Sequence, residues 1–245
     1  MADSAPRADS RPSMAYPREG GGGFDRAVFF SDAVFAIALT LVAVEIGIPE
    51  IDAGSSPSAL VAALVELAPK VGAYIVAFLW VAFYWRANHR FTTTLRGMSS
   101  RYVLALLLYL GFVALLPFPA ATLGEYWSNP VAIAFFALFA AAVSSLEVLL
   151  LVVAHRDGLF LTPLSTGEYR GAVLGGLTPV PAFLLSVPVA FVSPVAAVLC
   201  WLVIAVGLGA LLTRFGPGPV GGARPRSQGP REQWENGRRS TPGES

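Results

Sequence analysis

The chain has 245 residues, of which 55% are hydrophobic and only 13% are charged, and its formal net charge is +1. Soluble domains usually carry about 25% charged residues, so this composition excludes an ordinary soluble domain and indicates an integral membrane protein. One cysteine and two histidines exclude a disulfide framework, and also a zinc cluster or haem pair built within one chain.

The two ends of the chain differ in composition from its middle. Residues 1–23 and 216–245 are polar and rich in Gly and Pro. Such segments cannot bury enough apolar surface to offset the entropy lost on ordering. We expect both to be disordered cytoplasmic tails, and the C-terminal arginines leave a contact with the membrane surface or a partner open. Residues 24–215 are expected to form the transmembrane domain.

Six apolar stretches are long enough to cross a bilayer, for which a helix needs roughly 20 apolar residues. They are residues 27–49, 67–89, 102–123, 129–154, 169–191 and 194–214. The second has an amphipathic lead-in from about Ser58, with Glu66 and Lys70 at i,i+4 spacing. The sequence therefore predicts an all-α membrane protein with six transmembrane helices per subunit.

Prolines fall inside two of these spans. Pro117 and Pro119 are expected to end the third span, and Pro179, Pro181 and Pro188 to kink the fifth. Proline lacks the backbone N–H that a helix needs, and membrane helices tolerate it where neighbours satisfy the freed carbonyl groups.

The basic residues are sorted by position along the chain. Every arginine lies before the first span, in or beside the loops after the second and fourth spans, or after the sixth, and Lys70 alone lies near the other side. Lys and Arg gather in cytoplasmic loops. We therefore expect a multi-pass protein of the cell membrane with both termini in the cytoplasm.

The first span carries charge near its cytoplasmic end, where Arg26, Ser31 and Asp32 occur. A carboxylate at the centre of a membrane helix costs roughly 2.5 to 3.5 kcal/mol on insertion scales. Asp32 therefore needs a cation or several hydrogen-bond donors. Candidates are Arg26 and, at the end of the second span, Trp85 and His89. We interpret this group as a structural network, and direct proton handling is the alternative.

An apolar stripe occupies another face of the same span. Ile37, Leu41, Val44 and Ile48 recur at i, i+4, i+7 and i+11, whereas Asp32 points away from them. The spacing alone indicates contact with lipid or with another helix.

Three segments resemble the transmembrane protein 175 family, and the resemblance covers roughly residues 24–215. The specific one is the motif R-x-x-x-F-S-D at Arg26, Phe30, Ser31 and Asp32. The supporting ones are YWRANHRF, residues 84–91, and LLPFPAATLGEY, residues 115–126.

This resemblance implies a potassium-permeable cation channel, a homotetramer of six-helix subunits whose first helix lines a central pore. Matched by distance from the motif aspartate, the pore constriction would be formed by Ile37, Leu41 and Val44, with Thr40 as the polar pore-lining residue. An apolar constriction gates by dewetting. The sequence has no TVGYG-type carbonyl filter, so we expect only modest selectivity for K⁺ over Na⁺.

The resemblance also implies a hydrogen-bonded network that holds helices and subunits together. Its residues would be Arg26, Ser31, Asp32 and His89, and Phe30 and Trp85 would complete the structural network of the motif. At the other end of the first span, fourfold repetition of Glu45, Glu50 and Asp52 would give an acidic mouth that concentrates cations, and for Glu50 and Asp52 a simply solvated acidic loop is the alternative. K⁺ would be the permeant ion, with no cofactor, no bound metal and no nucleic-acid partner; the expected partners are further copies of the chain and the lipid bilayer.

Other functions stay open at this point. A proton- or cation-coupled secondary transporter would show saturable flux, and its fold would often show an internal repeat that we do not find here. A proton-conducting channel is a further alternative. An enzyme is not expected, because the sequence has no catalytic residues in an H-E-x-x-H, G-x-S-x-G or P-loop pattern. A non-conducting scaffold has only the weak G-x-x-x-G pattern of residues 171–175 in its favour.

Overall fold

The structure is a computed structural model that describes residues 14–19, 22–201 and 203–204. The chain divides into two units, Met1–Gly207 and Leu208–Ser245. Everything described below belongs to the first unit. The second unit, which includes the predicted tail 216–245, lies outside the described residues.

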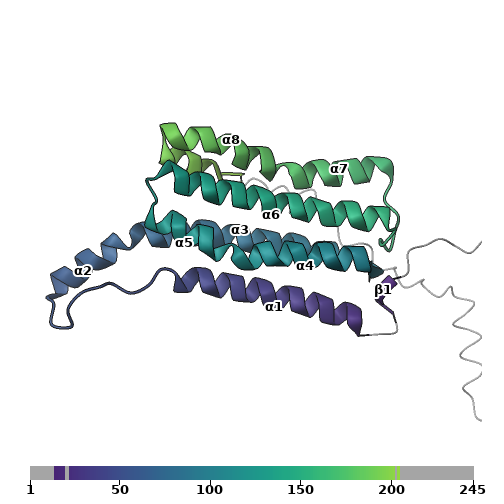
Figure 1. Ribbon diagram of the computed structural model, residues 1–245, viewed down its shortest axis with the longest axis horizontal. Coiled ribbons are helices and arrows are strands. Elements are labelled where there is room, and N and C mark those ends of the chain that lie inside the picture. The colour runs from purple at the N-terminus through teal and green to yellow at the C-terminus, as the bar shows by residue number, and fades with distance from the viewer. Residues whose placement is uncertain (1–13, 20–21, 202, 205–245) are drawn as a thin grey trace, which may run out of the picture. The chain divides into compact units, whose positions relative to one another are not determined.

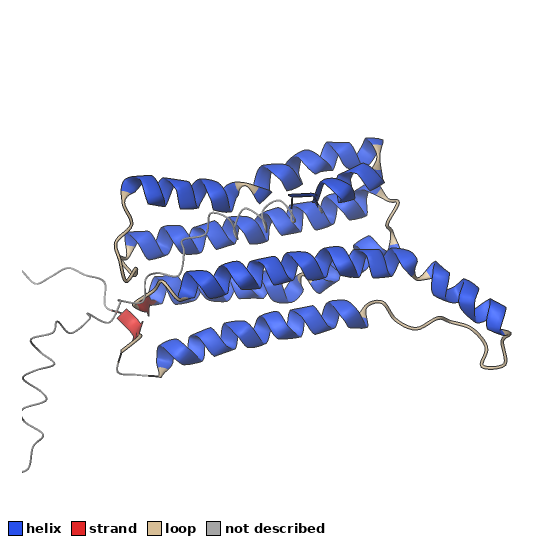
Figure 2. Cartoon of the chain, turned by 180° about the vertical axis from the view of Figure 1, so that it is seen from behind, coloured by secondary structure: helices blue, strands red, loops and turns tan. Residues whose placement is uncertain are grey.

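Long helices run side by side through the first unit (Figures 1 and 2). The helices are α1 (Gly23–Val44), α2 (Pro57–Glu66), α3 (Ala68–Thr92), α4 (Ser100–Leu115), α5 (Pro117–Glu125), α6 (Pro130–Arg156), α7 (Thr166–Leu177) and α8 (Pro179–Val192). Two short strands, β1 (Met14–Pro17) and β2 (Gly97–Ser99), pair in antiparallel fashion.

Among the described residues, five stretches are long and apolar enough to cross a membrane. They are Gly23–Val44, Ala68–Thr92, Ser100–Glu125, Pro130–Arg156 and Thr166–Val192. They match the first five predicted spans. Residues 194–201, 203 and 204 are helical, and the rest of the predicted sixth span lies outside the described residues.

Prolines interrupt the helices of the third and fifth crossings. Pro117 breaks the third crossing between α4 and α5, but the apolar crossing continues to Glu125, so this proline does not end the span as we predicted. In the fifth crossing, where we predicted a kink, α7 ends at Leu177 and α8 begins at Pro179, so the helix is interrupted there. Pro188 lies inside α8.

Aromatic side chains fill the space between the helices. Trp80 of α3 lies with its ring 4.6 Å from that of Phe183 of α8, and Trp201 lies 5.9 Å from Phe183. The Tyr84 hydroxyl lies 2.9 Å from the Ser144 hydroxyl of α6. Because lipid is as apolar as these residues, close packing and hydrogen bonds hold membrane helices together.

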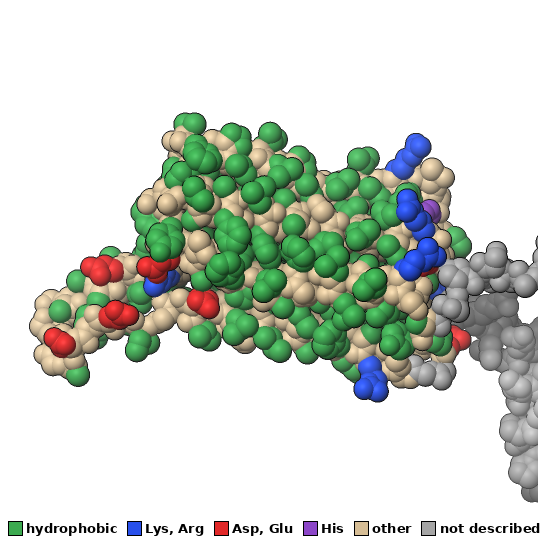
Figure 3. Space-filling model, in the orientation of Figure 1, with side chains coloured by type: hydrophobic (Ala, Val, Ile, Leu, Met, Phe, Trp, Pro, Cys, Tyr) green, Lys and Arg blue, Asp and Glu red, His purple; other side chains and the backbone are tan. Residues whose placement is uncertain are grey.

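Charged side chains gather at the two ends of the helices, with apolar side chains between them (Figure 3). We call the basic end the one that carries Arg26, Arg86, Arg90, Arg101, Arg156 and Arg170, and the acidic end the one that carries Glu45, Glu50, Asp52, Glu66 and Glu125. That the basic end faces the cytoplasm stays a prediction from the arginine distribution.

A strap formed by residues 14–18 binds the basic end of the helices. Strand β1 pairs with β2 in the loop between α3 and α4. Arg18 Nη1 donates to the carbonyl oxygens of Thr93, at 2.9 Å, and Leu95, at 3.0 Å, just beyond the end of α3. The Arg18 guanidinium also lies 5.4 Å from the ring centre of Phe24 in the first turn of α1. Residues 14–17, which we assigned to the tail 1–23, therefore form part of the fold.

A second set of contacts ties the loop after α6 to the same place. The buried Asp157 carboxylate accepts a hydrogen bond from the Ser99 hydroxyl at 2.5 Å. It also forms an ion pair with the Arg101 guanidinium at 3.0 Å. Leu95 and Phe160 form an antiparallel bridge. The cytoplasmic loops predicted from the sequence are thus linked to one another and, through the strap, to α1.

We expect Arg18→Ala to lower the free energy of unfolding by about 1 to 2 kcal/mol, because two charge-assisted hydrogen bonds are lost at a partly exposed site. Thermal unfolding of the purified protein measures this change. The control is Arg170→Ala, which removes an exposed arginine of α7. Equal losses in the two variants would show that the strap does not stabilise the fold.

Candidate functional site

One face of α1 packs against the rest of the molecule. Its buried residues are Phe24, Ser31, Phe35, Ala38 and Val42. They contact α3, α4 and α5. The ring of Phe35, for example, lies 6.1 Å from that of Tyr109 in α4. This packing fixes the rotation of α1 about its own axis.

The predicted apolar stripe lies on the exposed face of α1. Ile37 is 57% exposed, Leu41 43% and Val44 71%, although all three are large apolar residues. Thr40 lies among them and is also exposed, and its hydroxyl donates to the Ile37 carbonyl oxygen at 2.8 Å. The stripe therefore stays largely uncovered by the described helices of its own chain. It is available for contact with lipid or with another copy of the chain.

Asp32 and Trp85 join α1 to α3 near the basic end. Trp85 Nε1 donates to Asp32 Oδ1 at 2.9 Å. The imidazole of His89, one turn further along α3, stacks on the Trp85 indole with ring centres 5.5 Å apart. The carboxylate is half-buried, whereas the two rings are exposed on one side. Trp85 therefore supplies a hydrogen-bond donor to Asp32, which offsets part of the free-energy cost of placing a carboxylate in a membrane helix.

The structure brings together only part of the predicted network. Ser31 is buried, and its hydroxyl donates to the Ala27 carbonyl oxygen at 3.0 Å, within α1. Arg26 and Phe30 are exposed. Among the described residues the structure gives no hydrogen bond or ion pair between Asp32 and either Arg26 or His89. Their part in a network between subunits stays a prediction.

The sequence analysis missed the polar contact at the acidic end. Lys70 Nζ pairs with Glu125 at 2.8 Å, and so joins α3 to α5. The i,i+4 spacing had suggested Glu66 instead. A break between α2 and α3 at Leu67, followed by Pro69 in the first turn of α3, separates Glu66 from Lys70. The only hint in the sequence was the proline itself.

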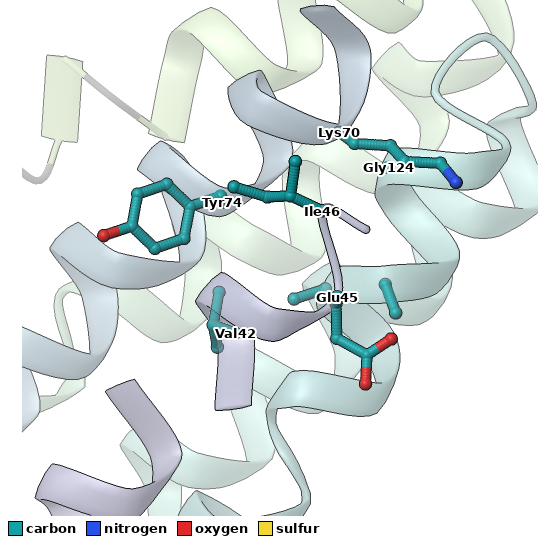
Figure 4. A pocket seen from close by; sticks show the side chains of 8 residues that line it. Val42, Glu45, Ile46, Lys70, Tyr74 and Gly124 are labelled. Carbon is teal, nitrogen blue, oxygen red and sulfur yellow. The ribbon is translucent and has the colours of Figure 1, made fainter. Parts of the chain in front are cut away.

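A small hollow lies between the end of α1, the start of α3 and α5 (Figure 4). Its lining includes Glu45, Ile46, Lys70, Tyr74 and Gly124. The space is about 10 Å³, which holds at most one water molecule. The Glu45 carboxylate extends away from the Lys70 ammonium group in Figure 4. This hollow is therefore not a substrate site, and Glu45 stays exposed at the acidic end.

These features define a class: a multi-pass helical membrane protein whose first helix exposes an apolar stripe and is held by a carboxylate–indole hydrogen bond. Residues 26–117 match the family model described as endosomal/lysosomal potassium channel TMEM175. The resemblance that we inferred from the R-x-x-x-F-S-D motif is thereby confirmed, and this part of the chain is similar to the TMEM175 potassium channels.

Individual relatives agree with the family match. A potassium channel of Streptomyces collinus is 34% identical over 131 residues, which cover 54% of this chain and 60% of that protein. A potassium channel of a Chryseobacterium species is 32% identical over 117 residues, which cover 47% of this chain and 57% of that protein. The chain thus spans somewhat more than half the length of these two relatives.

A solved structure shows the same fold over a longer stretch. The crystal structure of a lysosomal potassium-selective channel TMEM175 homologue from Chamaesiphon minutus has a TM-score of 0.67 and 25% sequence identity. The match covers 78% of this chain and 98% of that one. The helical arrangement described above is therefore that of a TMEM175 channel.

Replacing Trp85 by Phe removes the donor to Asp32 and keeps an aromatic ring. We expect a loss of about 1 to 2 kcal/mol in the free energy of unfolding, since the half-buried carboxylate loses its partner. Thermal unfolding in detergent measures the loss, and Trp127→Phe is the matched control because the structure gives no hydrogen bond from its indole to any described residue. A Trp85→Phe protein as stable as the control would mean that Asp32 does not depend on this bond.

Proposed function

We propose that the protein is a potassium-permeable cation channel whose pore is formed by α1 from several copies of the chain. The observation that carries the proposal is the exposed stripe of Ile37, Leu41 and Val44 on a helix whose opposite face is fully packed. Relatives of this chain are named potassium channels, which supports the same function.

A homotetramer is the assembly that we propose, as the family resemblance implies. Four copies of α1 with their stripes toward a common axis would form three apolar rings. At about 1.5 Å per residue, the rings of Ile37 and Leu41 are about 6 Å apart, and those of Leu41 and Val44 about 4.5 Å. Such a stack is a hydrophobic constriction, which stops ions when it dewets and conducts when it widens slightly.

Thr40 would supply the polar group of this pore. Its hydroxyl hydrogen is used by the Ile37 carbonyl oxygen. The lone pairs of the hydroxyl oxygen therefore remain able to coordinate a passing cation. The sequence contains no carbonyl filter of the TVGYG type. Selectivity for K⁺ over Na⁺ would then come from pore width and these hydroxyl groups, and it would be modest.

The acidic end would form one mouth of the pore. Glu45, Glu50 and Asp52 are exposed and follow directly on α1. Lys70 makes its direct ion pair with Glu125 and interacts with Glu45 and Glu50 only at longer range, so the carboxylates near α1 keep a net negative charge that attracts cations. Repeated in each subunit, they would raise the local concentration of K⁺.

We expect Ile37→Asn to wet the constriction and to increase the unitary conductance at least severalfold. Planar-bilayer recordings of the purified protein under a KCl/NaCl gradient measure this, and currents should reverse toward the potassium potential. Leu104→Asn is the control, because Leu104 is 71% exposed on α4, outside the proposed pore.

An equal effect of both substitutions, or none from Ile37→Asn, would remove Ile37 from the gate. Flux that saturates and requires a coupled ion gradient would favour a secondary transporter. Currents that follow a proton gradient and not the potassium gradient would favour a proton-conducting channel.

The double substitution Glu45→Gln and Glu50→Gln is expected to reduce potassium conductance at low ionic strength and to have little effect at high ionic strength. The Debye length falls from about 30 Å at 0.01 M salt to about 3 Å at 1 M, so the field of the mouth is screened. Glu66→Gln on α2 is the control. A reduction that persists unchanged in 1 M KCl would show a direct contact with the ion instead of a field.

A further inference from the structure

An apolar cleft of about 180 Å³ lies at the acidic end of the bundle. Its walls come from the first turns of α3, from Leu123 and Trp127 at and beyond the end of α5, and from the helical residues 194–199. All ten lining residues are apolar or glycine, and none belongs to α1. The cleft is therefore separate from the proposed pore.

Small residues on α3 make the space. Pro69, Gly72, Ala73 and Val76 recur at i, i+3, i+4 and i+7, so they share one face of the helix. A Cβ atom added at Gly72 would meet nothing within 4 Å. The facing wall is formed by larger residues, Val195, Val198 and Leu199. A groove remains between the two helices where α3 lacks side chains to fill it.

The cleft lies within the part of the chain that crosses the membrane. Its α3 wall belongs to the apolar stretch Ala68–Thr92. Val195 is 53% exposed and Leu199 54%, so the facing wall continues onto the outer surface of the helices. An apolar cavity of about 150 Å³ stays dry and takes up a small hydrocarbon. The size and the apolar lining of this cleft therefore suit a hydrocarbon group better than water.

We propose that this cleft binds one acyl chain of a membrane phospholipid. Trp127, 49% exposed, stands at its edge, and tryptophan is enriched where a membrane meets water. Lys70, the one lysine of the chain, follows Pro69 in α3. Its ammonium group is paired with the Glu125 carboxylate at 2.8 Å. The rim thus offers no free ammonium group to an anionic headgroup, and the acyl chain is what the site recognises.

The test is native mass spectrometry of the full-length protein, delipidated in detergent and titrated with palmitoyl-oleoyl phosphatidylcholine. The wild type should retain one tightly bound lipid per chain, and Gly72→Leu should weaken this binding at least tenfold because the leucine fills the groove. Leucine also suits a helix better than glycine, so the variant should fold. Gly111→Leu is the control: it lies on α4 in equally open space and outside the cleft.

Phosphatidylglycerol with the same chains should bind within about twofold of phosphatidylcholine. A strong preference for the anionic lipid, or equal lipid retention by Gly72→Leu and wild type, would overturn the proposal. So would a change of oligomeric state in Gly72→Leu without loss of lipid, since a second copy would then occupy the cleft. Should Gly72→Leu be recovered only unfolded, Val198→Phe narrows the same cleft from its other wall and must also weaken binding. None of these readouts requires ion conduction.

Discussion

The hydrogen bond from the Trp85 indole to the Asp32 carboxylate ties α1 to α3 and, together with the apolar packing of α1, sets the orientation of that helix. A carboxylate near the end of a membrane helix cannot be left without a donor. Only one rotation of α1 places Asp32 against α3, and that rotation also buries Phe35 and Ala38. The face with Ile37 and Leu41 is then left exposed. Polar and apolar requirements therefore select the same orientation, and the proposed pore is a consequence of it.

Five of the membrane crossings and the separation of Asp32 from the apolar stripe of α1 could be predicted because they depend on local information. Span length, helical periodicity and the isolated charge in an apolar helix can all be read from the residues themselves. The family motif added the interpretation of the stripe as a pore lining. Depth in the membrane limited the partners of Asp32 to Arg26, Trp85 and His89, but only the packing of α1 on α3 selects Trp85 among them.

Contacts between distant segments could not be predicted in this way. Strand β1 lies in a polar stretch, and its partner loop is 75 to 77 residues away along the chain at the Arg18 contacts. No periodicity relates the two segments. Likewise, Lys70 could pair with Glu66 or with Glu125. It pairs with Glu125 because the helix breaks at Leu67 and α5 lies next to α3. The cleft beside Gly72 depends on which helix faces α3, which the sequence does not state.

The strap of residues 14–18 has a consequence for biogenesis. It is synthesised before α1, yet its binding site is complete only after α3 and the loop that follows it have been synthesised. During synthesis, α1 therefore enters the membrane without an anchor at its N-terminal end. The anchor closes once the second crossing is in place, and this links the final position of α1 to the correct insertion of α3. A chain with a misinserted second crossing would carry an unclosed strap, and the backbone groups of β1 and the Arg18 guanidinium would lack their partners.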